Sequence, residues 1–331
     1  MCEQFMTSVC GRLAASARAL SALSLAPFPH AGIAADYPTR SLRYVVAFGP
    51  GGLNDVVGRV FCQKLNEAWG QPVIVDNRPG AGGNTGAELV ARSSPDGYTM
   101  LSISTAHAIG QTLYQKLGYS LERDLVPVSI LGSSPLITVV NAGVPVKSVP
   151  ELVKYAKSNK IAYASGGVGV ISQLSMEMLK QAAGFDATHV PYKGGGPALV
   201  DLLAGQVQFH SNDIGLVLPG IKSGKLRPIG MMTQKRHALQ PDAPTYVEQG
   251  YKDFVMGNWI GVVVPKGTPK PIIDKLAAEF MRIAKLPDVV ERFAGQGFDT
   301  SGTTPEAAAE LVKKETVRFG AAVKASGAKV D

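Results

Sequence analysis

The sequence predicts an α/β fold built as two lobes, and three observations lead to this prediction. From residue 41 onward, short apolar strands alternate with amphipathic helices, a pattern typical of parallel βαβ units. The chain has 331 residues, and because domains usually contain about 100–200 residues, we expect two of them. Apolar residues make up 45% of the chain and charged residues 18%, which supplies a sizeable core and excludes a disordered chain.

The first 35 residues have the layout of a secretory signal peptide. Arg12 and Arg18 precede the apolar run 19–26, and small residues follow as far as Ala35. We therefore expect residues 1–35 to be a signal peptide that is cleaved near Ala35. Elsewhere the chain lacks the run of about 20 apolar residues that a transmembrane helix needs.

The first lobe is predicted from strand–helix units in which glycine-rich loops follow the strands. Apolar residues recur at helical spacing after the first such loop, and Cys62 lies within that pattern, so we expect a buried thiol. The strands are expected at 42–48, 72–75 and 98–103, and the helices at 53–70 and from 86 to 92.

The second lobe is predicted from a further set of the same units, and two apolar strands connect it to the first. A capping box with proline at the helix start predicts a helix from residue 148. Other strands are expected at 161–164 and 189–192, and helices near 171–178, 198–204, 271 and 305. The strands at 136–140 and 259–264 are the expected connections, so lobe 1 would comprise 36–137 plus 258–331 and lobe 2 would comprise 138–257.

Glycine-rich loops between a strand and a helix recur along the chain, at 49–52, 80–86, 165–169 and 194–196. Glycine lets the backbone turn sharply and approach a ligand closely. A helix N-terminus adds unpaired N–H groups and the positive end of a dipole, which together bind carboxylate or phosphate. One such loop often serves shape alone, but their recurrence favours a binding site for a small anion.

Other kinds of site are not supported by the motifs. The sequence has no P-loop and no nucleophile elbow, and the glycines at 80, 82 and 86 are spaced one residue too widely for a dinucleotide fingerprint. The histidines have neither the spacing nor the cysteine partners of a metal site, so they are expected on the surface or lining a cleft, and no metal or cofactor is predicted. The net charge of +7 is scattered, which argues against nucleic-acid binding and is compatible with an anionic ligand.

Several motifs of the chain resemble those of the Bug family, the periplasmic receptors associated with tripartite tricarboxylate transporters. The resemblance covers about residues 37–331. It rests on Phe-Gly-Pro-Gly-Gly-x-x-Asp at 48–55, Asn-Arg-Pro-Gly-Ala-Gly-Gly at 77–83, Pro-Asp-Gly-Tyr-Thr at 95–99, Pro-Tyr-Lys-Gly-Gly-Gly-Pro-Ala at 191–198 and Gly-Lys-Leu-Arg at 224–227.

The resemblance implies a type II periplasmic-binding-protein fold, in which two crossing hinge strands join two lobes that close on a small organic acid. It implies a non-enzymatic periplasmic receptor, expected to be a monomer, for which membrane components of a tripartite tricarboxylate transporter are possible partners. The carboxylate would be held by the loops matching 48–55 and 165–169, with residues at the end of the third strand lining the cleft. The candidate ligand-binding residues are Phe48, Gly51, Gly52, Asn54, Asp55, Asn84, Ser104, Thr105, Ser165, Gly166, Gly169, Gln173, Tyr192, Lys193, Asn212 and Asp213.

This chain departs from the family pattern in the second lobe. Gln173 stands where the family often has histidine, and Ser211-Asn212 replaces the usual Phe-Asp, with Asp213 one residue later. Val168 and Val170 make the same region less polar. We therefore expect the loops to hold one carboxylate. The hypothesis is that the ligand is a monocarboxylate or an aromatic acid and not a citrate-like tricarboxylate.

Two other functional classes stay open at the level of the sequence. An α/β enzyme acting on a small anion would need a nucleophile activated by a base, and Ser104, Thr105 and Ser165 have no base at a recognisable spacing. Asp55 is either an acid–base or water-binding group, or a carboxylate that stabilises the first turn of its own helix. A surface interaction protein without a small ligand is the third class.

Overall fold

The computed structural model describes residues 37–326, so the predicted signal peptide at 1–35 lies outside the described residues. The strands are β1 (Leu42–Val46), β2 (Val73–Asn77), β3 (Thr99–Ser104), β4 (Leu125–Asn141), β5 (Ala162–Ser165), β6 (Thr188–Pro191), β7 (Phe209–Asp213), β8 (Leu226–Met231), β9 (Gly257–Pro265) and β10 (Asp299–Thr300). The helices are α2 (Leu53–Trp69), η1 (Ala81–Gly83), α3 (Asn84–Ala91), α4 (Thr105–Leu113), α5 (Leu121–Asp124), α6 (Val149–Ser158), α7 (Ile171–Ala183), α8 (Gly195–Leu203), α9 (Ile214–Lys222), α10 (Lys270–Ile283), α11 (Pro287–Ala294) and α12 (Pro305–Ser326).

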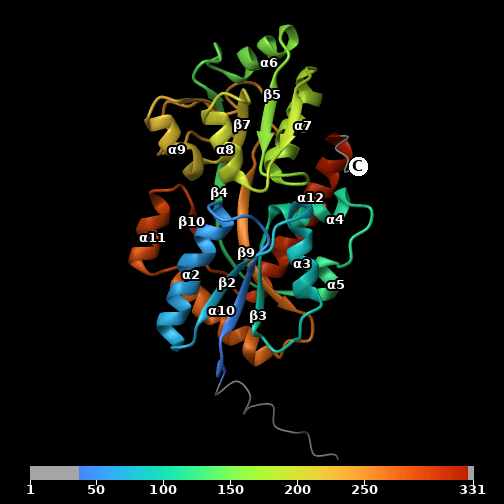
Figure 1. Cartoon of the computed structure of the whole chain (residues 1–331), viewed down its shortest axis with the longest axis vertical. Coiled ribbons are helices and arrows are strands. Elements are labelled where there is room, and N and C mark those ends of the chain that lie inside the picture. The colour runs from blue at the N-terminus through green and yellow to red at the C-terminus, as the bar shows by residue number, and fades with distance from the viewer. Residues whose placement is uncertain (1–36, 327–331) are drawn as a thin grey trace, which may run out of the picture.

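The predicted two-lobed α/β architecture is confirmed, and the lobes form the lower and upper parts of the molecule in Figure 1. The strands pair in the order β2-β1-β3-β9-β4-β7-β5-β6, and β8 and β10 each pair with β4. We call the part built on β1, β2, β3, β9, β10 and the start of β4 the first lobe. The part built on the end of β4 and on β5 to β8 is the second lobe.

The first lobe has helices on both faces of its sheet because side chains alternate along each strand. Tyr44 of β1 belongs to an apolar core that it shares with α2, α10 and α11, whereas its neighbour Val45 belongs to the core under α3, α4 and α12. The strands β2, β1 and β3 run parallel, as βαβ units require, and β9 pairs antiparallel with β3.

The second lobe repeats this arrangement on the parallel strands β6, β5 and β7, with β4 antiparallel to β7. Ile137 and Val139 pack with α8 and α9, whereas Val140 packs with α6 and α7 on the other face. In both lobes the helices α2, α4, α7, α8 and α9 follow the carboxyl ends of parallel strands. Open α/β sheets bind their ligands at these ends.

Strands β4 and β9 connect the two lobes. They pair antiparallel from Leu125 opposite Pro265 to Pro135 opposite Gly257, after which β4 continues into the second lobe beside β7 and β8. The predicted strand at 136–140 is therefore only the end of β4. The register shifts near Pro127 and Gly132 interrupt the alternating pattern by which a strand is recognised, which explains the shorter prediction. The predicted lobe boundaries fall at these two strands and stay a prediction.

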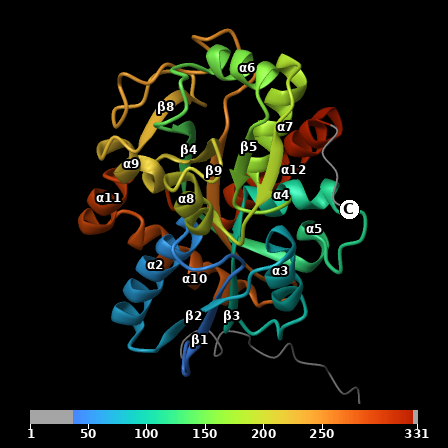
Figure 2. The same cartoon turned by 45° about the horizontal axis from the view of Figure 1, so that its top comes forward.

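Helix α12 packs against α4 of the first lobe and α7 of the second, which Figure 2 shows on the right of the molecule. The sequence predicts that the C-terminal helices return to the first lobe, and α12, a helix of 22 residues, contacts α7 of the second lobe in addition.

Local sequence signals predict the helix ends well. Helix α2 ends one residue before Gly70, whose φ of 65° and N–H bond to the Asn66 carbonyl form the expected glycine cap. Cys62, on the inner face of this helix, is buried as predicted, and burial raises the pKa of its thiol. At the start of α6 the hydroxyl of Ser148 accepts a hydrogen bond from the N–H of Glu151, as the capping box predicts. Within residues 37–326, no helix is both long and apolar enough to cross a membrane.

Candidate functional site

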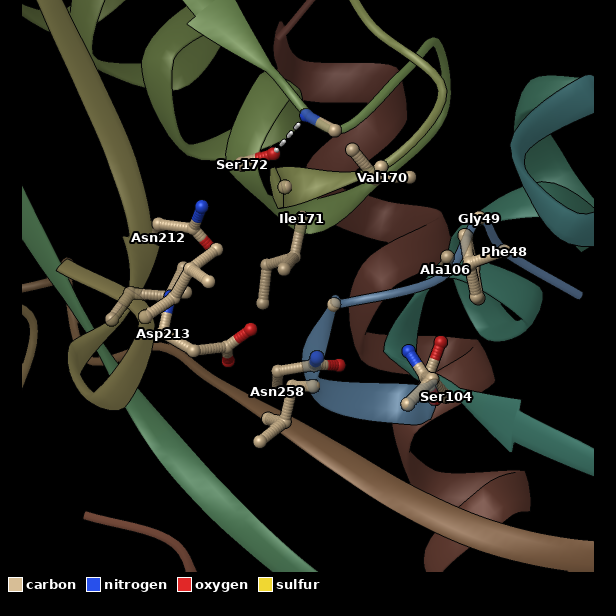
Figure 3. Close-up of a pocket in the computed structure, with 18 residues that line it drawn as sticks. Phe48, Gly49, Ser104, Ala106, Val170, Ile171, Ser172, Asn212, Asp213 and Asn258 are labelled. Atoms are coloured by element: carbon tan, nitrogen blue, oxygen red, sulfur yellow. Dashed lines mark hydrogen bonds between the residues drawn. The ribbon is translucent and has the colours of Figure 1, made fainter. Parts of the chain in front are cut away.

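A pocket of about 70 Å³ lies between the two lobes, at the carboxyl ends of the parallel strands (Figure 3). Both lobes line it. Phe48, Asn54 and Ser104 come from the first lobe, and Gly166 and Asp213 come from the second. The site therefore exists only when the lobes are together.

Five helices of the described chain begin at this pocket. Their N-cap residues are Gly52 of α2, Ser104 of α4, Val170 of α7, Gly194 of α8 and Asp213 of α9, and all five residues line the pocket. The first N–H groups of a helix have no partner within that helix, and its N-terminus is the positive end of the helix dipole. Together these helix ends make the pocket favourable for an anion.

The polar character of the pocket comes from the backbone and from neutral side chains. None of the described residues that line it is a lysine, arginine or histidine. The side chains of Asn54, Ser104, Ser172, Asn212 and Asn258 supply amides and hydroxyls, and Asp213 is the titratable group among the described lining residues. An anion bound here would be held by dipoles and hydrogen bonds and not by an ion pair.

The structure brings together part of the predicted site at the pocket and places the rest around it. The predicted residues that line the pocket are Phe48, Gly52, Asn54, Ser104, Gly166, Asn212 and Asp213. The predicted residues that do not line it are Gly51, Asp55, Asn84, Thr105, Ser165, Gly169, Gln173, Tyr192 and Lys193.

The hydroxyls of Thr105 and Ser165, two of the predicted ligand-binding residues, are both used in hydrogen bonds within the protein. The Oγ1 atom of Thr105 accepts a hydrogen bond from the N–H of Trp259 at 3.1 Å, which ties α4 to β9. The Oγ atom of Ser165 lies 2.6 Å from Nε2 of His189 and donates to the carbonyl of Gly167 at 2.8 Å. Neither residue is among those that line the pocket.

Other predicted residues also form hydrogen bonds that shape the surrounding loops. Gln173 accepts the N–H of Gly169 at 2.7 Å, which closes the loop ahead of α7. The hydroxyl of Tyr192 donates to Asp201 of α8 at 2.5 Å. Asn84 donates to the carbonyl of Ala81 and accepts from a tyrosine hydroxyl within the first lobe. None of these three residues is among those that line the pocket.

Asp55 stabilises the loop and the first turn of α2, so of the two roles considered for it the structure shows the structural one. One carboxylate oxygen accepts hydrogen bonds from the N–H of Gly51 and from Arg59, both at 3.0 Å, and the other accepts from Asn77 at 3.0 Å. Burial alone would raise the pKa of Asp55, but these three donors together lower it below the usual value. The N–H of Gly51, one of the predicted ligand-binding residues, thus bonds to Asp55.

Replacing Asp55 with asparagine should lower the free energy of unfolding by about 1–3 kcal/mol at neutral pH, because the hydrogen bonds to the buried charge are weakened. The pKa of Asp55 is lower in the folded protein than in the unfolded chain. The stabilisation is therefore complete above the unfolded pKa and is lost as the pH falls through the folded pKa. Urea unfolding at a series of pH values measures this. A loss below 0.5 kcal/mol at neutral pH would contradict the structural role.

The pocket also contains residues that the sequence did not indicate. Gly194 and Gly195 lie in the glycine-rich loop at 194–196, within the family-like motif at 191–198. That motif is the feature of the sequence that could have indicated them. Leu136, Leu216 and Asn258 carry no such signal, because apolar residues and a lone asparagine are common everywhere in the chain. Leu136 and Asn258 reach the pocket because β4 and β9 cross between the lobes.

Two histidines are buried and neutral, where the sequence predicted surface or cleft positions. Burial lowers the pKa of both His107 and His210 to about 4. His210 contacts the Ala164 carbonyl through Nδ1 at 2.7 Å and the side-chain nitrogen of Asn212 through Nε2 at 2.6 Å. A neutral ring protonated at Nδ1 satisfies both contacts, so Asn212 donates to the ring. This bond orients the Asn212 amide, whose oxygen then accepts the N–H of Asp213 at 2.8 Å.

Asp213 is the most unusual group of the site. It is 7% exposed, and its Oδ1 atom has no hydrogen-bond partner within the described part of the chain. Burial raises the pKa of Asp213 to about 7, although a hydrogen bond from Asn258 acts in the opposite direction. In Figure 3 its carboxyl group points into the pocket, toward Asn258.

Backbone contacts between the lobes close the pocket. A Cβ atom added to Gly49 would lie 2.5 Å from the carbonyl oxygen of Lys193, and one added to Gly82 would lie 2.5 Å from that of Val168. The hydroxyl of Tyr114 donates to the Val168 carbonyl at 3.1 Å. The glycine-rich loops of the two lobes thus touch each other. Lys193 takes part through its backbone.

No group of three or more histidine, cysteine, aspartate or glutamate residues within 37–326 could hold a metal ion.

Comparison with known proteins relates this fold and pocket to one family. The model of the tripartite tricarboxylate transporter family receptor matches residues 57–328. BugT of Bordetella pertussis is 38% identical over 309 residues, covering 91% of this chain and 95% of BugT.

Two solved structures are similar over almost their whole length. The periplasmic binding protein BugD is 34% identical with a TM-score of 0.84, covering 88% of this chain and 99% of BugD. MatC from Rhodopseudomonas palustris, solved with bound malate, is 32% identical with a TM-score of 0.83, covering 87% of this chain and 100% of MatC. The chain therefore belongs to the tripartite tricarboxylate transporter receptor family, the Bug family whose motifs its sequence resembles.

Proposed function

We propose that this protein is a periplasmic receptor that captures a small organic carboxylate between its two lobes, for uptake or sensing. The observation that carries the proposal is the convergence of five helix N-termini on a pocket that has no basic side chain among its described lining residues. The similarity to BugD and to malate-bound MatC supports it. The family membership makes membrane components of a tripartite tricarboxylate transporter the expected recipients of the ligand.

Binding would favour the closed form because the ligand contacts both lobes only when they are together. In an open form the ligand would meet the N-termini of α2 and α4 on one lobe, or those of α7, α8 and α9 on the other. Closure adds the second set. The strands β4 and β9 are the hinge about which the lobes would move.

The pocket fits a small ligand. Its 70 Å³ would hold about five water molecules at roughly 10–15 Å³ each. Leu136, Val170, Ile171 and Leu216 supply apolar contacts. We infer a short aliphatic carboxylate, which narrows the hypothesis drawn from the sequence. A citrate-sized ligand would require the lobes to open.

An enzymatic role is less well supported than a receptor role. An acyl or phosphoryl transferase would need a nucleophile next to a base at the ligand. The hydroxyl of Ser165 lies 2.6 Å from Nε2 of His189, but neither residue is among those that line the pocket. The hydroxyl of Ser172, which does line it, accepts the N–H of Gly166 at 3.1 Å. We propose a non-enzymatic, monomeric receptor. Recovery of the ligand unchanged after prolonged incubation distinguishes it from an enzyme.

A thermal-shift panel of acetate, butyrate, lactate, succinate, malate, adipate, benzoate and citrate at pH 6.5 tests the proposal. At a concentration 100 times its Kd, a ligand stabilises the folded state by about 2.7 kcal/mol. The melting temperature should then rise by roughly 5–10 °C with at least one short acid, and isothermal titration should give one site per chain. Failure of every acid to raise the melting temperature would reject the carboxylate receptor and favour an interaction protein. Conversion of an acid would favour an enzyme.

A further inference from the structure

We propose that Asp213 takes up one proton when a carboxylate enters the pocket, so that the protein binds its ligand together with a proton. The inference rests on the proposed function, and it adds a residue that determines which anions bind and at what pH. The family often has its acidic residue one position earlier, where this chain has Asn212. Proton uptake by Asp213 would therefore be a feature of this chain.

The position of Asp213 makes contact with a ligand unavoidable. It is the N-cap residue of α9, at the end of β7, and its side chain lines the pocket. Oδ1 has no partner among residues 37–326, although the side chain is almost fully buried. Figure 3 shows the carboxyl group directed into the cavity, beside Asn258. Because the cavity is only about 70 Å³, an acid that occupies it lies within a few ångströms of this carboxyl group.

The elements packed around Asp213 offer no charge that could balance it. Asn212 of β7, Asn258 of β9, Leu136 of β4, Leu216 of α9 and Gly195 of α8 line the same pocket, and none of them is charged. His210 is linked to Asp213 through Asn212, and burial keeps that ring neutral over the physiological range. The surroundings of Asp213 are therefore neutral side chains and helix N-termini.

A ligand carboxylate and an ionised Asp213 would place two like charges next to each other in one small, largely buried cavity. Such a pair disfavours ionisation of one partner, and the group with the higher pKa keeps the proton. Burial raises the pKa of Asp213 to about 7, whereas ordinary carboxylic acids have pKa values of about 4–4.5. Asp213 is thus the group that is protonated in the complex.

The protonated side chain then changes role from acceptor to donor. Its O–H group donates to the ligand carboxylate, forming a charge-assisted hydrogen bond, while the helix N-termini hold the single remaining negative charge. In balance, one carboxylate anion, one protein with ionised Asp213 and one proton from solvent give a complex with a neutral Asp213.

Titration calorimetry with butyrate and succinate tests this at pH 6, 7 and 8. Each pH is measured in two buffers that differ in ionisation enthalpy, which yields the number of protons taken up. We expect about 0.5 proton per ligand at pH 7 and close to 1 at pH 8, and an affinity about tenfold weaker at pH 8 than at pH 6.

Two substitutions of Asp213 separate the effect of a hydrogen-bond donor at this position from the effect of the negative charge. Asp213→Asn supplies a neutral N–H donor, so the pH 6 to pH 8 affinity ratio should fall from about tenfold to below twofold and proton uptake should vanish. Asp213→Ala supplies no donor and should bind more weakly than Asp213→Asn at both pH values. Infrared difference spectra of wild type against Asp213→Asn report the protonated carboxyl band without any ligand, and this band should disappear with a midpoint near pH 7.

The outcomes are distinguishable from failure of the proposed function. Binding of an acid without proton uptake overturns the inference alone, as does a carboxyl band that is absent above pH 5. Stronger binding at pH 8 than at pH 6, with loss of binding in Asp213→Asn, would mean that ionised Asp213 accepts a donor from the ligand, which also overturns it. Absence of binding by every acid at every pH, in wild type and variants, rejects the receptor function and the inference with it.

Discussion

Replacing Asp213 with asparagine should make the ligand-free protein progressively more stable than wild type as the pH rises, by about 3 kcal/mol between pH 5 and pH 8. The pKa of Asp213 is about 7 in the folded protein and 3.8 for the model group. The folded state therefore binds the proton more tightly than the unfolded chain. Wild-type stability is lost as the pH rises from the unfolded to the folded pKa, a total of about 4 kcal/mol at 1.36 kcal/mol per pH unit. Asparagine has no proton to lose.

Urea unfolding of both proteins at pH 5, 6, 7 and 8 measures this difference. His107 and His210 titrate identically in the two proteins, so their contributions cancel. Asp55→Asn is the matched control, because the pKa of Asp55 is lowered and its carboxyl is ionised in both states over this range. Its destabilisation should be constant from pH 5 to pH 8. A gap between Asp213→Asn and wild type that stays within 1 kcal/mol across the range would show that Asp213 ionises normally.

Replacing Gly49 with alanine should weaken ligand binding about 10–100-fold and leave the stability of the ligand-free protein nearly unchanged. The new Cβ atom would lie 2.5 Å from the carbonyl oxygen of Lys193 in the opposite lobe. That oxygen is backbone and cannot rotate away, so the lobes have to separate. Over-packing of this kind costs about 1–3 kcal/mol. An open form has no such clash, because Gly49 and Lys193 are then apart.

Calorimetry with the acid found by the thermal-shift panel measures the affinity, and small-angle scattering of the liganded variant should show a larger radius of gyration than liganded wild type. Gly295→Ala is the matched control, since a Cβ there would have no neighbour closer than 3.8 Å and the residue has a helical φ of −63°. Its affinity should equal that of wild type. Unchanged affinity in Gly49→Ala would mean that ligand binding does not need the contact between these loops.

Much of the fold follows from short-range patterns. The alternating apolar residues of β1, the helical spacing in α2 with its glycine cap at Gly70, and the capping box at Ser148 all lie within a few residues of the structures that they predict. Helices and strands form or end according to such neighbours, so a single sequence predicts them. The recurrence of glycine-rich loops before helices also predicts an anion site, and loops around Gly52, Gly166 and Gly194 do line the pocket.

The glycine-rich loop at 80–86 does not line the pocket, although its local pattern is the same as that of the other loops. Its glycines have the same local pattern, but Gly82 packs beneath the Val168 carbonyl of the other lobe and takes no part in the pocket. Likewise, the hydroxyls of Ser165 and Thr105 have partners on other elements, His189 and Trp259. A local pattern cannot show which partner a polar side chain meets, because the partner is brought by another segment.

The alternation of strands and helices, their caps and the preference for an anion are thus properties of neighbouring residues and could be predicted from the chain alone. The composition of the pocket and the chemistry of Asp213 could not be predicted in this way. They depend on the pairing of β4 with β7 and β9, which brings Leu136 opposite Asp213 and sets Asn258 beside the same cavity. These residues are more than 40 positions apart in the sequence, and burial, which raises the pKa of the carboxyl, arises only when distant segments exclude water together.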